Sequence, residues 1–204
     1  MLDNLTKEQR FRFLQNEMSY DPLHQKDADI SYHCYLNYIK MNTKLNLSPS
    51  GLAMLKRLEG VRYSAYRDSA GLWTTGVGHL IRPDEMINLC NRVLTPVEVD
   101  ALLYSDIKNT VNCVNGSVLV NLAQHQFDAL VMFTFNVGTT AFKGSSLLVA
   151  LNAGKYETAG NKLLDWNKIT TKGKLGKPVK IVSDGLNARR IRERELFLSG
   201  VYWA

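Results

Sequence analysis

Hydrophobic residues recur at helical spacing in several segments between residue 47 and the end of the chain. In the first of these segments, Leu52, Leu55 and Leu58 form one apolar stripe, which is typical of a helix that packs one face against a core. Ser48 precedes the stripe and can cap the helix. Further helices with such a pattern are predicted at residues 95–107, 123–137, 144–154, 156–168 and 187–200.

Residues 59–79 interrupt this helical pattern. Gly71, Gly76 and Gly78 are interleaved there with aromatic and β-branched residues such as Trp73 and Thr75. This mixture favours a short, twisted antiparallel hairpin or meander rather than a helix. Together with the helical segments, it predicts an α+β, mostly helical fold with one small antiparallel sheet near the start of the main domain.

The N-terminal region has helical patterns of its own, at residues 7–18 and 29–42. Two short helices cannot enclose a core by themselves. We therefore expect residues 1–47 to be an N-terminal helical extension of unknown role, packed on the main domain or on a partner. Residues 48–204 are expected to form that main domain.

Charge is distributed unevenly along the 204 residues. Residues 1–48 hold equal numbers of acidic and basic side chains, so the net charge of +6 belongs entirely to residues 49–204. Part of this charge falls in residues 168–184, a Lys- and Gly-rich segment predicted to be a basic loop or flap. A basic domain suggests an anionic partner, such as nucleic acid, a membrane surface or bacterial wall polymer. Charge alone does not choose among the three.

Several classes of protein are disfavoured by what the sequence lacks. Its apolar runs are too short to span a bilayer, and its charged N-terminus resembles neither a signal peptide nor a membrane anchor. The three cysteines are odd in number and not closely spaced, and the four histidines form no cluster with metal-ligand spacing. We therefore predict no transmembrane segment, no disulfide framework, no metal site and no cofactor.

The carboxyl groups of residues 59–79 are compatible with hydrolysis of a glycosidic bond, although a Glu at a helix end and an Asp in a turn are also common in proteins without this chemistry. Such bonds are cut by two carboxyl groups, one protonated to assist the leaving oxygen and one ionised to activate water or attack the sugar. Glu59 ends an apolar helix, where partial desolvation favours a protonated carboxyl. Asp68 occupies a polar turn, and Thr74 offers a hydroxyl that can hold a water molecule beside it.

The whole block strongly resembles the phage lysozyme family, glycoside hydrolase family 24, of T-even and lambdoid phages. The resemblance rests on Glu59 followed by Gly60, on the spacing from Glu59 to Asp68 and Thr74, and on the sequence TGVGH that follows. The segments SPSGLAMLKRLEG, FDALVMFTFNVG and GLNARRIRERELFL are similar to that family and occur in its order. The similarity covers residues 48–199.

This resemblance implies a lysozyme-like fold and a muramidase. Such an enzyme hydrolyses the beta-1,4 bond between N-acetylmuramic acid and N-acetylglucosamine in peptidoglycan, with a net inverting outcome in the type member. It implies that Glu59 is the general acid, that Asp68 positions and activates water, and that Thr74 holds this water.

The resemblance implies roles for further residues. His79 is expected to form a structural ion pair with Asp106. Asn136, Ser145 and Ser146 match a segment that hydrogen-bonds sugar amides, although a helix end with a capping serine would look the same. Arg189 and Arg190 match a region in which an arginine faces the acid. The sequence leaves open which of the two does so, and a solvated basic helix face remains an alternative.

Other functions are compatible with parts of the pattern. A lytic transglycosylase needs one acid and no aspartate for water, and a catalytically idle wall-binding module could retain the fold. Nucleic-acid binding rests on charge alone and is not predicted.

As an endolysin, the protein is expected to be a monomer, made in the host cytoplasm and acting on the wall in the periplasm. Release by a holin and delivery as an antibacterial effector are alternative routes to the wall.

Overall fold

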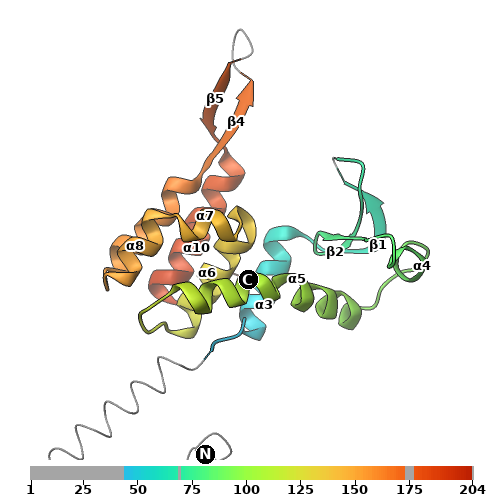
Figure 1. The fold of residues 1–204 in the computed structure, drawn as a ribbon, viewed down its shortest axis with the longest axis horizontal. Coiled ribbons are helices and arrows are strands. Elements are labelled where there is room, and N and C mark those ends of the chain that lie inside the picture. The colour runs from blue at the N-terminus through green and yellow to red at the C-terminus, as the bar shows by residue number, and fades with distance from the viewer. Residues whose placement is uncertain (1–43, 69, 173–176, 204) are drawn as a thin grey trace, which may run out of the picture. The chain divides into compact units, whose positions relative to one another are not determined.

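The computed structural model describes residues 44–68, 70–172 and 177–203 (Figure 1). The predicted helices at residues 7–18 and 29–42 lie outside the described residues. The described part begins with an extended segment that leads into the first helix, α3. Among the described residues, no helix combines the length and the apolar content needed to cross a membrane.

Helices make up most of the described chain, and each helical segment predicted after residue 47 is present. Their bounds are α3 Pro49–Glu59, α4 Met86–Leu89, α5 Pro96–Ser117, α6 Gln124–Val137, α7 Thr139–Lys143, α8 Ser146–Asn152, α9 Tyr156–Lys162, the 3-10 helix η2 Leu163–Trp166, and α10 Asp184–Ser199. The short helices α4 and α7 have no counterpart among the predicted segments. Helix α5 also extends ten residues beyond its predicted end at residue 107.

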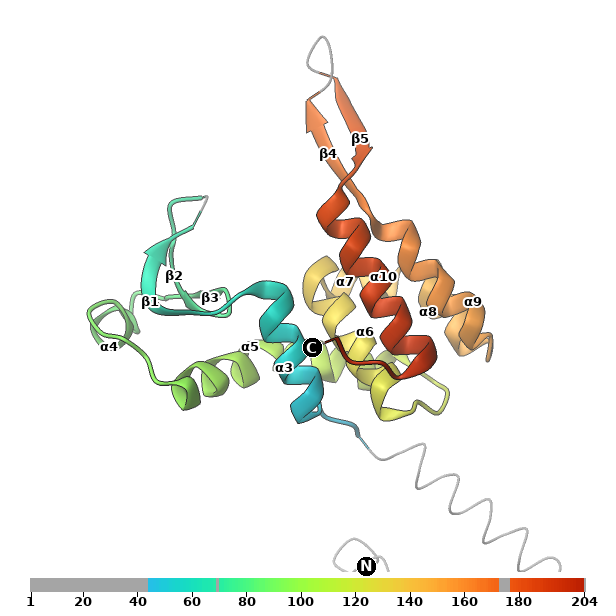
Figure 2. The ribbon, with the colours of Figure 1, turned by 180° about the vertical axis from the view of Figure 1, so that it is seen from behind.

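The core forms around α6, which packs against α10, α5 and α3. Nearly the whole middle of this helix is buried, including Phe127, Leu130 and Phe133. Figure 2 shows α10 passing across α6, with α8 and α9 on the far side of α10. A helix that is apolar nearly all round belongs at the centre of a fold, and the composition of α6 places it there.

Two hydrogen-bonded caps fix where the helices next to the sheet begin. Ser48 Oγ accepts a hydrogen bond from the Gly51 N–H at the start of α3. Thr95 and Glu98 form a reciprocal capping box at the start of α5. These local contacts satisfy N–H groups that a helix leaves without partners in its first turn.

The sheet near the start of the domain has three antiparallel strands in the order β1-β2-β3: Arg62–Arg67, Trp73–Gly76 and His79–Leu80. Gly76 and Gly78 adopt φ values of 61° and 80° at the turn between β2 and β3. This left-handed region is favourable for glycine and strained for other residues. The predicted α+β, mostly helical fold with a small antiparallel sheet near its start is confirmed.

A second sheet lies where the sequence predicted a basic loop or flap. Strands β4 (Lys168–Lys172) and β5 (Pro178–Val182) pair antiparallel. This β4–β5 hairpin joins η2 to α10 and projects from the helices (Figures 1 and 2). The segment is therefore a regular two-stranded ribbon.

Candidate active site

Glu59 is the last residue of α3. The helix stops there because Gly60 adopts a φ of 79° while its N–H closes the last turn on the Lys56 carbonyl. The residue as a whole is exposed at the helix end, but its side chain is only 23% exposed. Glu59 Oε1 lies 2.7 Å from Arg189 Nη2. An ion pair thus connects the end of α3 to α10.

Arg189 is held firmly in this position. It is 8% exposed, its Nε donates to Glu193 Oε1 at 2.9 Å, and its Nη2 donates to the Met132 carbonyl at 3.2 Å. Burial acts to lower the pKa of Arg189, but the carboxylates of Glu193 and Glu59 raise it above its ordinary value. The guanidinium is therefore a permanent positive charge beside Glu59.

Arg190 faces a different set of groups. Its Nη2 donates to Asn136 Oδ1, its Nη1 lies 3.1 Å from Glu193 Oε2, and its guanidinium lies 5.0 Å from the centre of the Phe133 ring. Arg190 and Glu193 are completely buried. Of the two arginines left open by the sequence, Arg189 is thus the one that contacts Glu59.

Glu193 was not identified as a site residue from the sequence. It lies four residues after Arg189 and three after Arg190, and both spacings place opposite charges on one helix face. That spacing is the signal that could have identified it. Its burial beneath two arginines depends on the packing of α10 against α6.

Asp68 opens the turn between β1 and β2. Its Oδ1 accepts hydrogen bonds from the N–H groups of Ala70 and Leu72, at 2.9 and 2.8 Å. Its Oδ2 makes no hydrogen bond with residues 44–68, 70–172 or 177–203. One carboxylate oxygen therefore orders the turn, and the other has no hydrogen-bond partner among those residues.

Thr74 lies on β2, paired with Tyr66 of β1. It is 4% exposed, and its Oγ1 donates to the Leu72 carbonyl at 3.3 Å. The hydroxyl lone pairs can still accept a hydrogen bond from another donor. Within the described residues, no hydrogen bond joins Glu59, Asp68 and Thr74 to one another. They are connected through the chain: α3 ends at Glu59, β1 leads to Asp68, and β2 carries Thr74.

His79 lies at the start of β3 and contacts two carboxylates. Its Nδ1 is 2.9 Å from Asp106 Oδ1 on α5, and its Nε2 is 3.2 Å from Glu85 Oε2. The structure thus brings His79 and Asp106 together and adds Glu85, which the sequence reasoning missed. Burial acts to raise the pKa of Glu85, but hydrogen bonds from Arg82 and His79 lower it to about 2.

The remaining predicted sugar-binding residues differ in exposure. Ser145 is 3% exposed, and its Oγ caps α8 by accepting from the Leu148 N–H at 3.1 Å. Ser146 is the first residue of α8 and is exposed, as is Asn136. Ser145 thus has the capping geometry that the sequence left open as an alternative.

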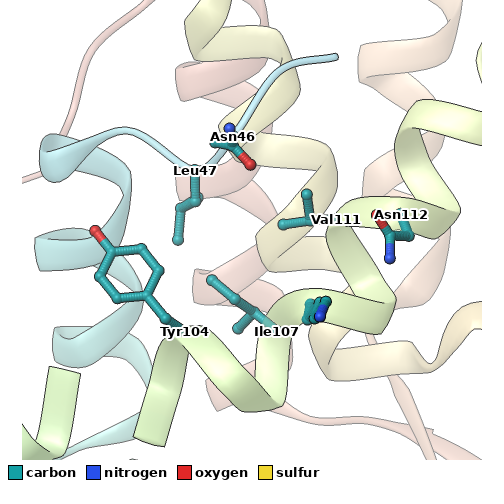
Figure 3. A pocket seen from close by; sticks show the side chains of 7 residues that line it. Asn46, Leu47, Tyr104, Ile107, Val111 and Asn112 are labelled. Carbon is teal, nitrogen blue, oxygen red and sulfur yellow. The ribbon is translucent and has the colours of Figure 1, made fainter. Parts of the chain in front are cut away.

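A pocket of about 280 Å³ lies elsewhere, between the segment that precedes α3 and one side of α5. Figure 3 shows Leu47, Tyr104, Ile107 and Val111 around it. It is lined by none of the predicted site residues. Within the part of the chain that the structure describes, no three His, Cys, Asp or Glu side chains gather in a way that could hold a metal ion.

The fold, with a carboxyl at a helix end beside a small sheet, defines a lysozyme-like glycoside hydrolase. The family described as Phage lysozyme matches residues 56–193, and the chain belongs to this family. The family and the enzyme class predicted from the sequence motifs are both confirmed.

Individual relatives agree with this assignment. The chain is 37% identical to the endolysin of Acyrthosiphon pisum secondary endosymbiont phage 1, over 76% of this chain and 99% of the relative. It is 38% identical to the endolysin of Salmonella phage P22, with the same two coverages. The solved structure of an endolysin from Escherichia coli O157:H7 phage FAHEc1 matches 79% of this chain and 99% of its own, at 36% identity and a TM-score of 0.69.

Proposed function

We propose that this protein is a muramidase that degrades peptidoglycan by hydrolysing the beta-1,4 bond between N-acetylmuramic acid and N-acetylglucosamine. Glu59 donates a proton to the leaving oxygen as the sugar bond breaks. Asp68 accepts a proton from the attacking water, and Thr74 holds this water in place. Two carboxyl groups in these roles are the usual requirement for glycoside hydrolysis.

The observation that carries this proposal is the ion pair between Glu59 and Arg189. An acid must be held at a defined place next to the bond that it protonates. Arg189 supplies that restraint because its Nη2 contacts Glu59 Oε1 and its Nε bonds the buried Glu193. One oxygen of a protonated carboxyl still accepts from Nη2, so the restraint holds while the other oxygen carries the proton. A solvated glutamate at a helix end would not need such support.

The hydrogen bonds of Asp68 support its role with water. The two backbone N–H groups that bond Oδ1 fix the orientation of the carboxylate. Oδ2 then remains available for a water molecule. Thr74 donates to a backbone carbonyl, so its oxygen can accept from the same water.

We propose supporting roles for the other residues. Asn136 and Ser146 are exposed and suited to bonding sugar amides, whereas Ser145 contributes by capping α8. Arg190 holds Asn136, and His79 and Asp106 tie the sheet to α5 without taking part in the chemistry. Residues 1–47 serve targeting, regulation or packing and take no part in bond cleavage.

The site of action that fits this chemistry is the bacterial cell wall. We propose that a protein made in the host cytoplasm reaches the wall after holin release or by another delivery route. It acts there as a monomer, and the proposed chemistry needs no second copy because every proposed catalytic residue belongs to one chain.

The decisive experiment is mass analysis of the muropeptides released from purified sacculi. The native protein should release fragments with reducing muramic acid ends. Glu59→Gln should lower this release by at least about 100-fold, because the acid is lost. Its amide keeps the size of the side chain, so the circular dichroism spectrum should not change.

Glu157→Gln is the matched control, because Glu157 is exposed on α9, away from the residues proposed here. It should release fragments at the native rate. Anhydromuramic ends would instead identify a lytic transglycosylase. A folded native protein that binds sacculi and releases nothing would be an idle wall-binding module.

A further inference from the structure

The β4–β5 hairpin has two chemically different faces. Its register pairs Ile169 with Ile181 and Thr170 with Lys180, and paired residues of an antiparallel ribbon project from the same face. The first set, the aliphatic face, consists of Ile169, Thr171, Val179 and Ile181. Among the residues whose side chains the structure describes, the second set, the lysine face, consists of Lys168, Thr170, Pro178, Lys180 and Val182.

The aliphatic face is not covered by the described part of the chain. Ile169 and Val179 are each 44% exposed, and Ile181 is 45% exposed. A two-stranded ribbon is only marginally stable in water unless its apolar side packs against something. Three neighbouring aliphatic side chains that are this exposed therefore indicate a surface that binds an apolar partner.

The charge of the hairpin has a single sign. Residues 168–182 contain five lysines and no acidic residue. Within the described residues, Lys168, Lys177 and Lys180 form no salt bridge. The hairpin thus offers uncompensated positive charge beside an exposed aliphatic surface, which suits a partner that is anionic and apolar at once.

The base of the hairpin is anchored to the helices. Ser183 N–H donates to the Asn167 carbonyl at 2.9 Å, and Asn167 Nδ2 donates to Asn187 Oδ1 at 3.0 Å. Trp166 packs edge-on against Phe133, with ring centres 5.5 Å apart. The ribbon therefore projects from a fixed base, as Figures 1 and 2 show.

We propose that the β4–β5 hairpin binds a membrane surface rich in anionic phospholipid. The aliphatic face enters the boundary between head groups and acyl chains, and the side chains of Lys168 and Lys180 extend to the lipid phosphates. A wall polymer would satisfy the lysines but leave Ile169, Val179 and Ile181 in water, so a lipid surface fits both faces better. This inference does not rest on the proposed hydrolytic activity.

Co-sedimentation of the full chain with vesicles tests the proposal. Binding is expected to vesicles of phosphatidylglycerol mixed with phosphatidylethanolamine, and not to phosphatidylcholine alone. The double variant Lys168→Gln with Lys180→Gln should lower the partition coefficient about 20- to 30-fold, since each lysine near an anionic surface contributes about 1 kcal/mol. Ile169→Ser with Ile181→Ser should lower it about tenfold or more.

The matched control combines Ile87→Ser with Lys155→Gln. Ile87 is 88% exposed on α4 and Lys155 is exposed, so this pair alters one aliphatic residue and one lysine outside the hairpin. Its binding to vesicles should equal that of the native protein. Activity on membrane-free sacculi should be the same for all variants, which separates this test from that of the proposed function.

Each of the following results would overturn the proposal. The native chain could bind neutral and anionic vesicles equally, or neither. Both hairpin variants could bind anionic vesicles as well as the native chain does. The variants could lose binding to sacculi while keeping binding to vesicles, which would identify a wall polymer as the partner. They could also convert a dimer to a monomer in solution, which would identify a second copy of the chain.

Discussion

Arg189 bonds two carboxylates through different nitrogens, Nη2 toward Glu59 and Nε toward Glu193. A guanidinium can do this because its donors are fixed in a planar fork. A lysine ammonium has all its donors on one nitrogen, so it cannot reproduce contacts that two separate nitrogens of a planar fork make. The restraint on Glu59 thus depends on the identity of this side chain as well as on its charge.

Arg189→Lys should therefore lower kcat by about tenfold to 100-fold, because a small misplacement of a catalytic group has effects of this size. Arg190→Lys is the matched control. Arg190 donates to Asn136 and forms an ion pair with Glu193, and it does not contact Glu59. Its replacement should therefore destabilise the fold more than it lowers kcat. Steady-state rates on sacculi and urea unfolding of both variants measure the difference. Equal losses of kcat would mean that Arg189 has no special role in positioning Glu59.

At the scale of elements, the end of the three-stranded sheet is tied to the helices by His79. Asp106 reaches it from α5 and Glu85 from the segment before α4. Leu80 pairs with Thr74 and Thr75 pairs with His79. A contact that holds β3 therefore also holds β2, the strand that carries Thr74.

Glu85 should stabilise the folded protein at neutral pH and lose this effect in acid. Its pKa is lowered from 4.5 to about 2 in the folded protein. The stabilisation is therefore present above pH 4.5 and is lost as pH falls through about 2. Urea unfolding from neutral pH down to about pH 2 should show the native protein more stable than Glu85→Gln, with the difference disappearing at the acid end.

Asp84→Asn provides the comparison for this experiment, since the neighbouring carboxylate is 75% exposed. Its unfolding curve should stay close to that of the native protein throughout. A difference between native and Glu85→Gln proteins that persists unchanged at the acid end would show that the carboxylate charge is not what stabilises this corner.

At the scale of the whole molecule, residues just before α3 belong to the packed unit. The Leu45 N–H donates to Asn115 Oδ1 at 3.0 Å, and Asn115 Nδ2 donates to the Leu45 carbonyl at 2.8 Å. Leu47 is 5% exposed. Ser48 Oγ also donates to Asp128 on α6, at 2.5 Å. The segment thus connects α3 to α5 and α6 before the helix begins.

A chain beginning at Lys44 should melt close to the temperature of the full chain and release muropeptides at a similar rate. A chain beginning at Pro49 should be less stable by about 3 kcal/mol, because it loses the Ser48 cap and the burial of Leu47. Thermal unfolding and sacculus digestion compare the two. If the chain from Lys44 folds but is inactive, residues 1–43 contribute to cleavage.

The helices were predictable because their signals are local. Thr95 and Glu98 have the spacing of a capping box and so predict the start of α5, and the apolar stripe of α3 ends at Glu59. The extension of α5 to Ser117 was not predicted, since its last turns are largely polar and their few apolar residues, such as Val111 and Val114, become buried only in the folded domain. The β4–β5 hairpin was predicted only as a loop or flap because its glycines and lysines obscure the alternation of the strands.

The sequence by itself determined the family, the enzyme class and the candidate residues Glu59, Asp68 and Thr74. Their spacing lies within one short segment whose glycines and caps define its local structure. Only the tertiary structure decided that Arg189, and not Arg190, meets Glu59. Adjacent residues of a helix point in different directions, and which of them faces α3 depends on how α10 rotates as it packs against α6.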